Sequence, residues 1–166
     1  RFEYGRYADG FVRLVRQQAR LSSGLALEPT EVRVALANLE QALQTRPGFA
    51  EALRMMAVGQ AMLGNAAAAL TAIDESLALT ANDTAAWRVC VAVLREVAPR
   101  ELAAEIEARL EQHGPSMQPA MRLHVYGMLA DEYLRLQQPT RAYELLVLEA
   151  LPVAFGHADQ LTAAQW

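Results

Sequence analysis

Apolar residues recur along the chain as pairs of helical stripes separated by short polar breaks. In the segment 50–83, one stripe precedes Gly64-Asn65 and a second stripe follows it. The first stripe is Leu53, Met56, Ala57 and Gln60, and the second is Ala69, Leu70, Ile73 and Leu77. Spacings of three and four residues place side chains on one face of an α-helix, and Gly-Asn favours a turn. The segment therefore predicts a helical hairpin, which must stack on neighbours to bury both stripes.

Similar hairpins are predicted on both sides of this segment. A helix over 4–21, a loop over 22–29 and a helix opened by Thr30 with Glu31 precede it. Asn82-Asp83 supplies N-cap candidates for a further hairpin over 84–112, in which Pro99 is expected in the first turn of the second helix.

The last predicted hairpin is displaced by the insertion His113-Gly114-Pro115-Ser116. Its stripes carry Tyr126, Leu129, Ala130 and Tyr133, and then Ala142, Leu145, Leu146 and Glu149. We expect Pro152 to end its second helix, since proline cannot continue the α-helical hydrogen-bond ladder.

An internal period of 34 residues links these hairpins. Ala35, Ala69 and Ala103 are 34 residues apart, and Leu39 matches Ile73 at the same spacing. With Leu53, Ala57, Gly64 and Ser76, and with Trp87, Tyr126, Ala130 and Ala142 in later hairpins, the pattern resembles the tetratricopeptide repeat (TPR) family. Glu107 departs from it, because the family has an apolar residue at that position.

The resemblance implies an all-α fold, a right-handed superhelical array of antiparallel helical hairpins with about three and a half repeats. The organisation expected is an irregular N-terminal helix and loop over 1–29, repeats over 30–152 and a tail or capping helix over 153–166. Within the tail, a short helix from Ala158 to Gln165 would cover the array together with Trp166. The chain begins with Arg1, so we expect it to be a piece of a longer protein.

Composition and charge argue against two classes of function, nucleic-acid binding and membrane spanning. The net charge is −4, and all 15 basic residues are Arg, which indicates a GC-rich coding bias. This balance argues against a nucleic-acid partner. The 19-residue charge-free run Met55–Ile73 contains a Gly-Asn turn, which argues against a membrane span.

The sequence contains no recognisable catalytic set. His113, His124 and His157 have neither metal-ligand spacing nor a nucleophile beside them, and His113 is expected in a loop. Cys90 lies on a core stripe, where an inert thiol is expected. We therefore expect no enzyme activity, no cofactor and no metal.

The resemblance also implies a concave groove lined by the first helix of each hairpin. The groove residues expected from the family pattern are Arg54, Arg88, Arg95, Arg135, Val58, Met62, His124 and Asp131. Arg54 and Arg88 are one period apart, and guanidinium groups bind carboxylates well, so an acidic peptide is the expected ligand. The alternative is that these arginines pair with Glu51, Glu96 and Asp131 and only solvate the surface.

The resulting expectation is a scaffold or adaptor that holds a peptide or a partner subunit in a bacterial assembly. Two alternatives stay open: a TPR-type secretion chaperone, and a non-catalytic domain of a larger enzyme or of an envelope or exopolysaccharide assembly protein. A homo-oligomer formed through the atypical ends is a further option. We expect a soluble protein of the bacterial cytoplasm or periplasm, and the partner is not identified by the sequence.

Overall fold

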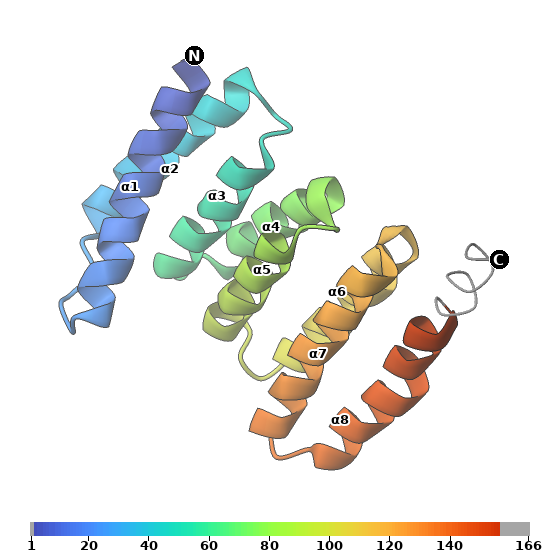
Figure 1. Cartoon of the computed structure of the whole chain (residues 1–166). Helices are drawn as coiled ribbons and strands as arrows, with labels where there is room; N and C mark the ends of the chain where they lie inside the picture. The colour runs from blue at the N-terminus through green and yellow to red at the C-terminus, as the bar shows by residue number, and fades with distance from the viewer. Residues whose placement is uncertain (1, 157–166) are drawn as a thin grey trace. The chain divides into compact units, whose positions relative to one another are not determined.

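The computed structural model describes residues 2–156, and these residues are helical almost throughout, with no strand (Figure 1). The helices are α1 (Phe2–Ser22), α2 (Pro29–Thr45), α3 (Ala50–Met62), α4 (Ala66–Thr80), α5 (Thr84–Val97), α6 (Leu102–His113), α7 (Pro119–Arg135) and α8 (Pro139–Glu144). A 3-10 turn, η1 (Gly114–Ser116), follows α6, and a π-helical segment, η2 (Leu145–Ala150), continues α8. The predicted all-α class is confirmed.

The described chain divides into two compact units. The first contains the residues up to Thr80 together with Arg88–Pro99. The second contains Ala81–Trp87 together with the residues from Arg100 onward. Helix α5 contributes to both.

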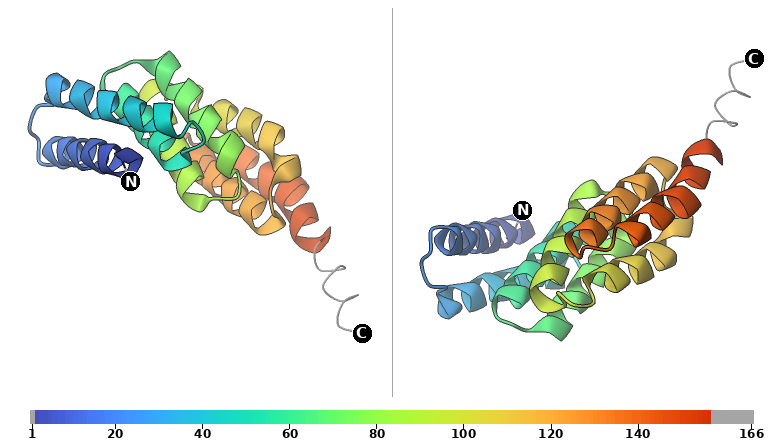
Figure 2. Two further views of the ribbon diagram at one scale, coloured as in Figure 1. Left: turned by 90° about the horizontal axis from the view of Figure 1, so that it is seen from above. Right: turned by 90° about the horizontal axis from the view of Figure 1, so that it is seen from below.

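In the first unit, α1 and α2 lie side by side and antiparallel, and α3 packs against both (Figure 2). Gly10 permits the approach of α1 to α2: a Cβ atom there would lie 2.9 Å from the backbone oxygen of Ala35 and 2.9 Å from Cγ of Leu39. The core at this junction consists of Leu14, Val32, Ala35, Leu36, Leu39, Phe49 and Ala52. The small residues at 10 and 35 thus set how closely the helices pack.

The hairpin of α3 and α4 forms at the predicted turn. Gly64 has a φ of +76°, a left-handed conformation that glycine adopts at little cost. Beyond the turn, Ala69 and Ile73 are fully buried, and the Ser76 hydroxyl donates to the backbone oxygen of Ala50 at 3.2 Å. The repeat's small and apolar positions therefore form the contact between the two helices.

In the second unit, Trp87 anchors the start of α5. Its side chain is fully buried, its Nε1 donates to the backbone oxygen of Ala81 at 2.9 Å, and its ring meets that of His113 edge-on at 6.4 Å. The backbone N–H of Ala85 donates to Oδ1 of Asp83 at 2.8 Å, which confirms the predicted N-cap. The expectation of a loop position for His113 is wrong, because this residue ends α6 and packs against Trp87.

The start of α6 also differs from the expectation. This helix begins at Leu102, so Pro99 lies in the preceding turn rather than in its first turn. Leu102 and Ala103 are its first buried side chains, and the helix starts where these two meet the core.

The last helix passes through Pro152 and continues through residues 151–156, so the expected stop at Pro152 is wrong. The reason lies in η2, where the N–H of Leu151 donates to the carbonyl oxygen of Leu146, five residues earlier. This wider turn leaves room for the proline ring, which would clash with the fourth preceding carbonyl in a regular α-helix. The helix expected over Ala158–Gln165 lies outside the described residues.

Candidate functional site

The first unit contains a groove of about 330 Å³ between residues of α1, α3 and α5. Its lining is Gln18, Leu21, Ser22, Leu27, Val58, Ala61, Met62, Ala92, Val93 and Glu96. Seven of these ten side chains are apolar, and the three polar ones come from α1 and the last turn of α5. The volume is at the low end for ligand pockets, roughly 300–1,000 Å³, and suits one or two apolar side chains of a partner.

Two of the predicted groove residues line this site. Val58 and Met62 are four residues apart on α3, so they share one face of that helix. Both are half-buried and their neighbour Ala61 lines the groove with them. Two of the eight predicted residues therefore line the pocket of this unit.

The predicted arginines of α5 lie beside the groove rather than in it. Arg88, Ala92 and Arg95 are exposed and follow one another at spacings of four and three, so they share a face of α5. Ala92 lines the groove, and the two arginines are one turn away on either side of it. The edge of the groove on α5 therefore carries two guanidinium groups, with the carboxylate of Glu96 next to them.

Arg54 has a different environment from Arg88 and Arg95. Its side chain is only 11% exposed, its Nη2 lies 3.9 Å from Oε1 of Glu51, and it does not line the groove. It also acts on Tyr7: burial and the Glu51 carboxylate raise the pKa of Tyr7, and the Arg54 charge opposes that rise. The structure thus brings Arg54 and Glu51 together, as the alternative interpretation expected.

The remaining predicted residues lie on α7, in the second unit. His124, Asp131 and Arg135 are exposed, and Nη1 of Arg135 lies 3.6 Å from the buried Glu132 carboxylate rather than beside Asp131. The cleft of this unit uses other positions of α7, namely Arg122, Tyr126 and Leu129. The three predicted residues therefore lie apart from the cleft of their own unit.

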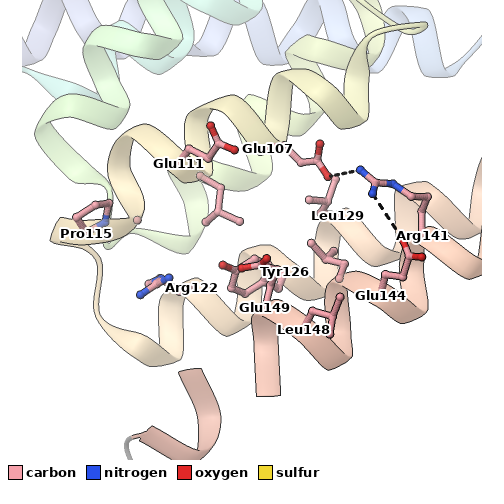
Figure 3. A pocket seen from close by; sticks show the side chains of 13 residues that line it. Glu107, Glu111, Pro115, Arg122, Tyr126, Leu129, Arg141, Glu144, Leu148 and Glu149 are labelled. Carbon is pink, nitrogen blue, oxygen red and sulfur yellow. Dashed lines mark ion pairs between the residues drawn. The ribbon is translucent and has the colours of Figure 1, made fainter. Parts of the chain in front are cut away.

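This cleft has a volume of about 670 Å³ and opens between α6 with η1, α7, and α8 with η2 (Figure 3). Its lining is Glu107, Leu110, Glu111, Gly114, Pro115, Arg122, Tyr126, Leu129, Arg141, Glu144, Leu145, Leu148 and Glu149. Four of these residues are glutamates and two are arginines, so the lining has a formal charge of −2. Leucines from three helical segments form its apolar part.

At one end of the cleft the charges are mutually satisfied. Arg141 lies 3.7 Å from Glu107 and 3.5 Å from Glu144, as the dashed lines in Figure 3 show. The hydroxyl of Tyr133 donates to Oε1 of Glu107. Burial, and then this hydrogen bond, raise the pKa of Tyr133, so the phenol stays protonated and keeps donating. Glu107, the departure from the repeat pattern, is thus accommodated by a polar network.

At the other end the charged groups lack partners among the described residues. Nε of Arg122 is buried without a hydrogen bond, and a Cβ atom built on Gly114 would lie 3.6 Å from it. Glu111 and Glu149 line the same end, and neither forms an ion pair with another described residue. An unsatisfied buried donor costs about 1–3 kcal/mol, so Nε of Arg122 would gain from a hydrogen-bond acceptor placed at this end of the cleft.

Sequence reasoning did not identify this cleft. Two of its signals were nevertheless visible: the glutamate at an apolar position of the repeat, and the insertion over 113–116 that displaces the last hairpin. Gly114 and Pro115 of that insertion form part of the lining.

Within residues 2–156, no three His, Cys, Asp or Glu side chains are grouped closely enough to bind a metal ion. Cys90 is buried, as expected for a core thiol. None of the helices in that range combines the length and the hydropathy that crossing a bilayer requires.

In comparisons with known proteins, no protein family, curated protein or solved structure matches the chain. The function must therefore be argued from the residues alone.

Proposed function

We propose that this protein is a non-catalytic binding module of the tetratricopeptide-repeat type, a scaffold or adaptor that holds a peptide segment of a partner protein. Its site is the groove of the first unit. The ligand inserts one or two apolar side chains between α3 and α5 and places acidic residues against Arg88 and Arg95.

The repeat character is supported by the burial of its small positions. Ala35, Ala69 and Ala103 are each buried, on α2, α4 and α6 respectively. A small residue at a helix contact lets two backbones approach closely, and a larger one costs about 1–3 kcal/mol in overpacking. A period of 34 residues that recurs as a burial pattern favours stacked hairpins.

The observation that carries the proposal is the chemistry of the groove. Residues far apart in sequence, on α1, α3 and α5, leave an apolar hollow open to solvent, and the α5 edge bears two arginines. Hydrophobic anchors in a groove with charged residues at the rim are how helical and extended peptides are held. Burial of the anchors supplies the affinity, and the rim charges select acidic partners.

A matched pair of alanine substitutions tests this proposal. Ala92 is exposed in the middle of α5 and lines the groove, whereas Ala37 is exposed in the middle of α2 and does not. Each has an arginine four residues before it, so a glutamate introduced at either position has an arginine on the same helical face. The chain is used to capture partners from its own organism, and the captured protein is then purified and titrated against each variant.

We expect Ala92→Glu to weaken binding at least about tenfold, roughly 1.4 kcal/mol, and Ala37→Glu to leave it unchanged. Circular dichroism spectra that match the wild type show that both variants are folded. The proposal is wrong if both variants bind the purified partner equally well, or if no partner is captured.

A further inference from the structure

Among the described helices, α1 packs against α2 and α3, and the face that it leaves exposed is apolar. The exposed residues Ala8, Phe11, Val12, Val15 and Ala19 recur at helical spacing and form a single stripe, here called the α1 stripe. Val12 is 52% exposed, and the stripe from residue 8 to residue 19 is about 17 Å long at 1.5 Å per residue. Arg16 flanks it and forms no ion pair with another described residue.

The last described helix has a similar outward face. The buried residues Ala142, Leu145 and Ala150 point toward α7, and the five-residue step between the last two requires the π-helical turn of η2. That turn leaves a second set exposed, here called the α8 stripe, formed by Tyr143, Leu148, Leu151 and Phe155, of which Leu148 also lines the cleft of this unit. Phe155 is 67% exposed, and the stripe runs from residue 143 to residue 155, close to the length of the α1 stripe.

Each stripe exposes apolar surface that a neighbouring helix would bury in a stacked-helix protein, and none of the described helices covers it. Contiguous exposed apolar residues of this kind mark an interaction surface.

The charges around the two stripes favour one occupant. On α1, Arg13 pairs with Asp9 and Glu31, and Arg20 pairs with Glu28, so Arg16 is the charge beside the stripe that forms no ion pair with another described residue. On the last helix, Arg141 pairs with Glu107 and Glu144, so Glu149, next to Leu148, is the charge that forms none. Like charges oppose two α1 stripes or two α8 stripes, whereas an α1 stripe and an α8 stripe attract one another.

We propose that a second copy of this chain covers each stripe, so that the α1 stripe of one copy packs on the α8 stripe of the next. The contact joins two different surfaces and is therefore heterologous, which leads to rings or open chains rather than to a closed two-fold dimer. It is independent of the groove of the first unit, which does not use either stripe.

Blocking each stripe separately tests the arrangement. Val12→Asp places a carboxylate in the α1 stripe, and Leu151→Asp places one in the α8 stripe. Leu79→Asp is the matched control, because Leu79 is 53% exposed near the end of α4 and belongs to neither stripe. The molar mass of the full chain is measured by sedimentation over micromolar to millimolar concentrations, against the monomer mass of 18.2 kDa.

We expect the molar mass of the wild type and of Leu79→Asp to rise above that of a dimer as the protein concentration increases. Each stripe variant alone should stay a monomer. An equimolar mixture of Val12→Asp and Leu151→Asp has one intact stripe of each kind and should stop at dimers of one copy of each. Arg16→Glu should weaken the association, and adding Glu149→Arg should restore it in part.

Three results would overturn the proposal. A wild type that stays monomeric throughout shows that another segment or another protein covers the stripes. A dimer that survives Val12→Asp, or one that survives Leu151→Asp, shows a two-fold contact through the other stripe. A mixture of the two variants that stays monomeric shows that the two stripes do not bind each other.

Discussion

The groove of the first unit and the cleft of the second unit are both bounded by helices, yet their linings differ in chemistry. Seven of ten residues in the groove are apolar, whereas the cleft has four glutamates and two arginines among thirteen. In the first unit, closely packed small residues hold the helices together, as at Gly10 and Ala35. In the second unit, the half-buried carboxylate of Glu107 is stabilised by Tyr133 and Arg141. The lining of the groove in the first unit is therefore mainly apolar, whereas the cleft of the second unit is lined by charged side chains that partly pair with one another.

The largest expected effect is the loss of unfolding free energy when a buried leucine of each unit is replaced by alanine. Leu39 and Leu129 are both fully buried, but Leu39 lies in a closed core and Leu129 lines the cleft. Replacement of a buried leucine by alanine costs about 2–5 kcal/mol, depending on how far the surroundings close around the cavity. We expect Leu39→Ala near the upper end of this range and Leu129→Ala near the lower end, because solvent and Leu148 can fill space beside an existing cleft.

Urea unfolding followed by circular dichroism measures both changes in the free energy of unfolding. An equal loss in the two variants would mean that the second unit is as tightly packed as the first around its core leucines.

The next effect tests the close packing of the first unit through two helical glycines. A Cβ atom at Gly10 would contact the backbone oxygen of Ala35 at 2.9 Å, whereas one at Gly127 on α7 meets nothing within 4 Å. Alanine stabilises an open helical position by about 0.5–1 kcal/mol relative to glycine. We expect Gly127→Ala to raise stability by this amount and Gly10→Ala to lower it by about 1–3 kcal/mol, through overpacking. Denaturation midpoints that rise in both variants would contradict the packing difference.

A third effect belongs to the polar network of the second unit. Tyr133→Phe removes the donor to Glu107 and should cost about 1 kcal/mol at neutral pH. Since burial and Glu107 raise the pKa of Tyr133 in the folded state, this tyrosine stabilises the fold fully below its unfolded pKa of about 10, and less as pH rises through its folded pKa. We therefore expect the stability difference between wild type and Tyr133→Phe to shrink above about pH 10.

Unfolding curves at several pH values between neutral and strongly alkaline conditions measure this trend. Tyr7, whose pKa is raised mainly by burial in the first unit, remains in both proteins and so cancels from the comparison. A difference that stays constant with pH would show that the Tyr133 hydroxyl does not depend on Glu107.

The fold was predictable where the apolar spacing was regular. The turn at Gly64, the N-cap at Asp83 and the buried alanines at 35, 69 and 103 all follow from local spacing and turn chemistry. The errors fell where tertiary contacts override local rules. His113 lies at the end of α6, where its ring packs against Trp87. The π-helical turn before Pro152 allows the helix to continue past the proline.

The site was predictable only in its apolar part. Val58 and Met62 line the groove, and their spacing of four residues, which places them on one helical face, can be seen in the sequence. The cleft depends on how Glu107, Tyr133 and Arg141 satisfy one another across three helices, and no spacing along the chain encodes such a network.

The smallest expected effect separates the two sites by the charge of their ligands. Arg88 lies at the edge of the groove and forms no ion pair with another described residue, whereas the cleft lining is acidic by two charges. An acidic partner should therefore prefer the groove, and Arg88→Glu should weaken its binding by up to about 1 kcal/mol, the size of a typical exposed charge pair. Arg33→Glu is the control, because Arg33 is exposed on α2 and does not line the groove. Most of the loss should appear in the association rate and should vanish at high salt, since rim charges steer encounter over about a Debye length.

Arg54→Glu is a poorer probe, because that side chain is mostly buried beside Glu51 and its reversal would also destabilise the fold. Surface plasmon resonance with the purified partner at two salt concentrations measures the rates, and an equal effect of Arg88→Glu and Arg33→Glu would leave only the apolar anchors to explain recognition.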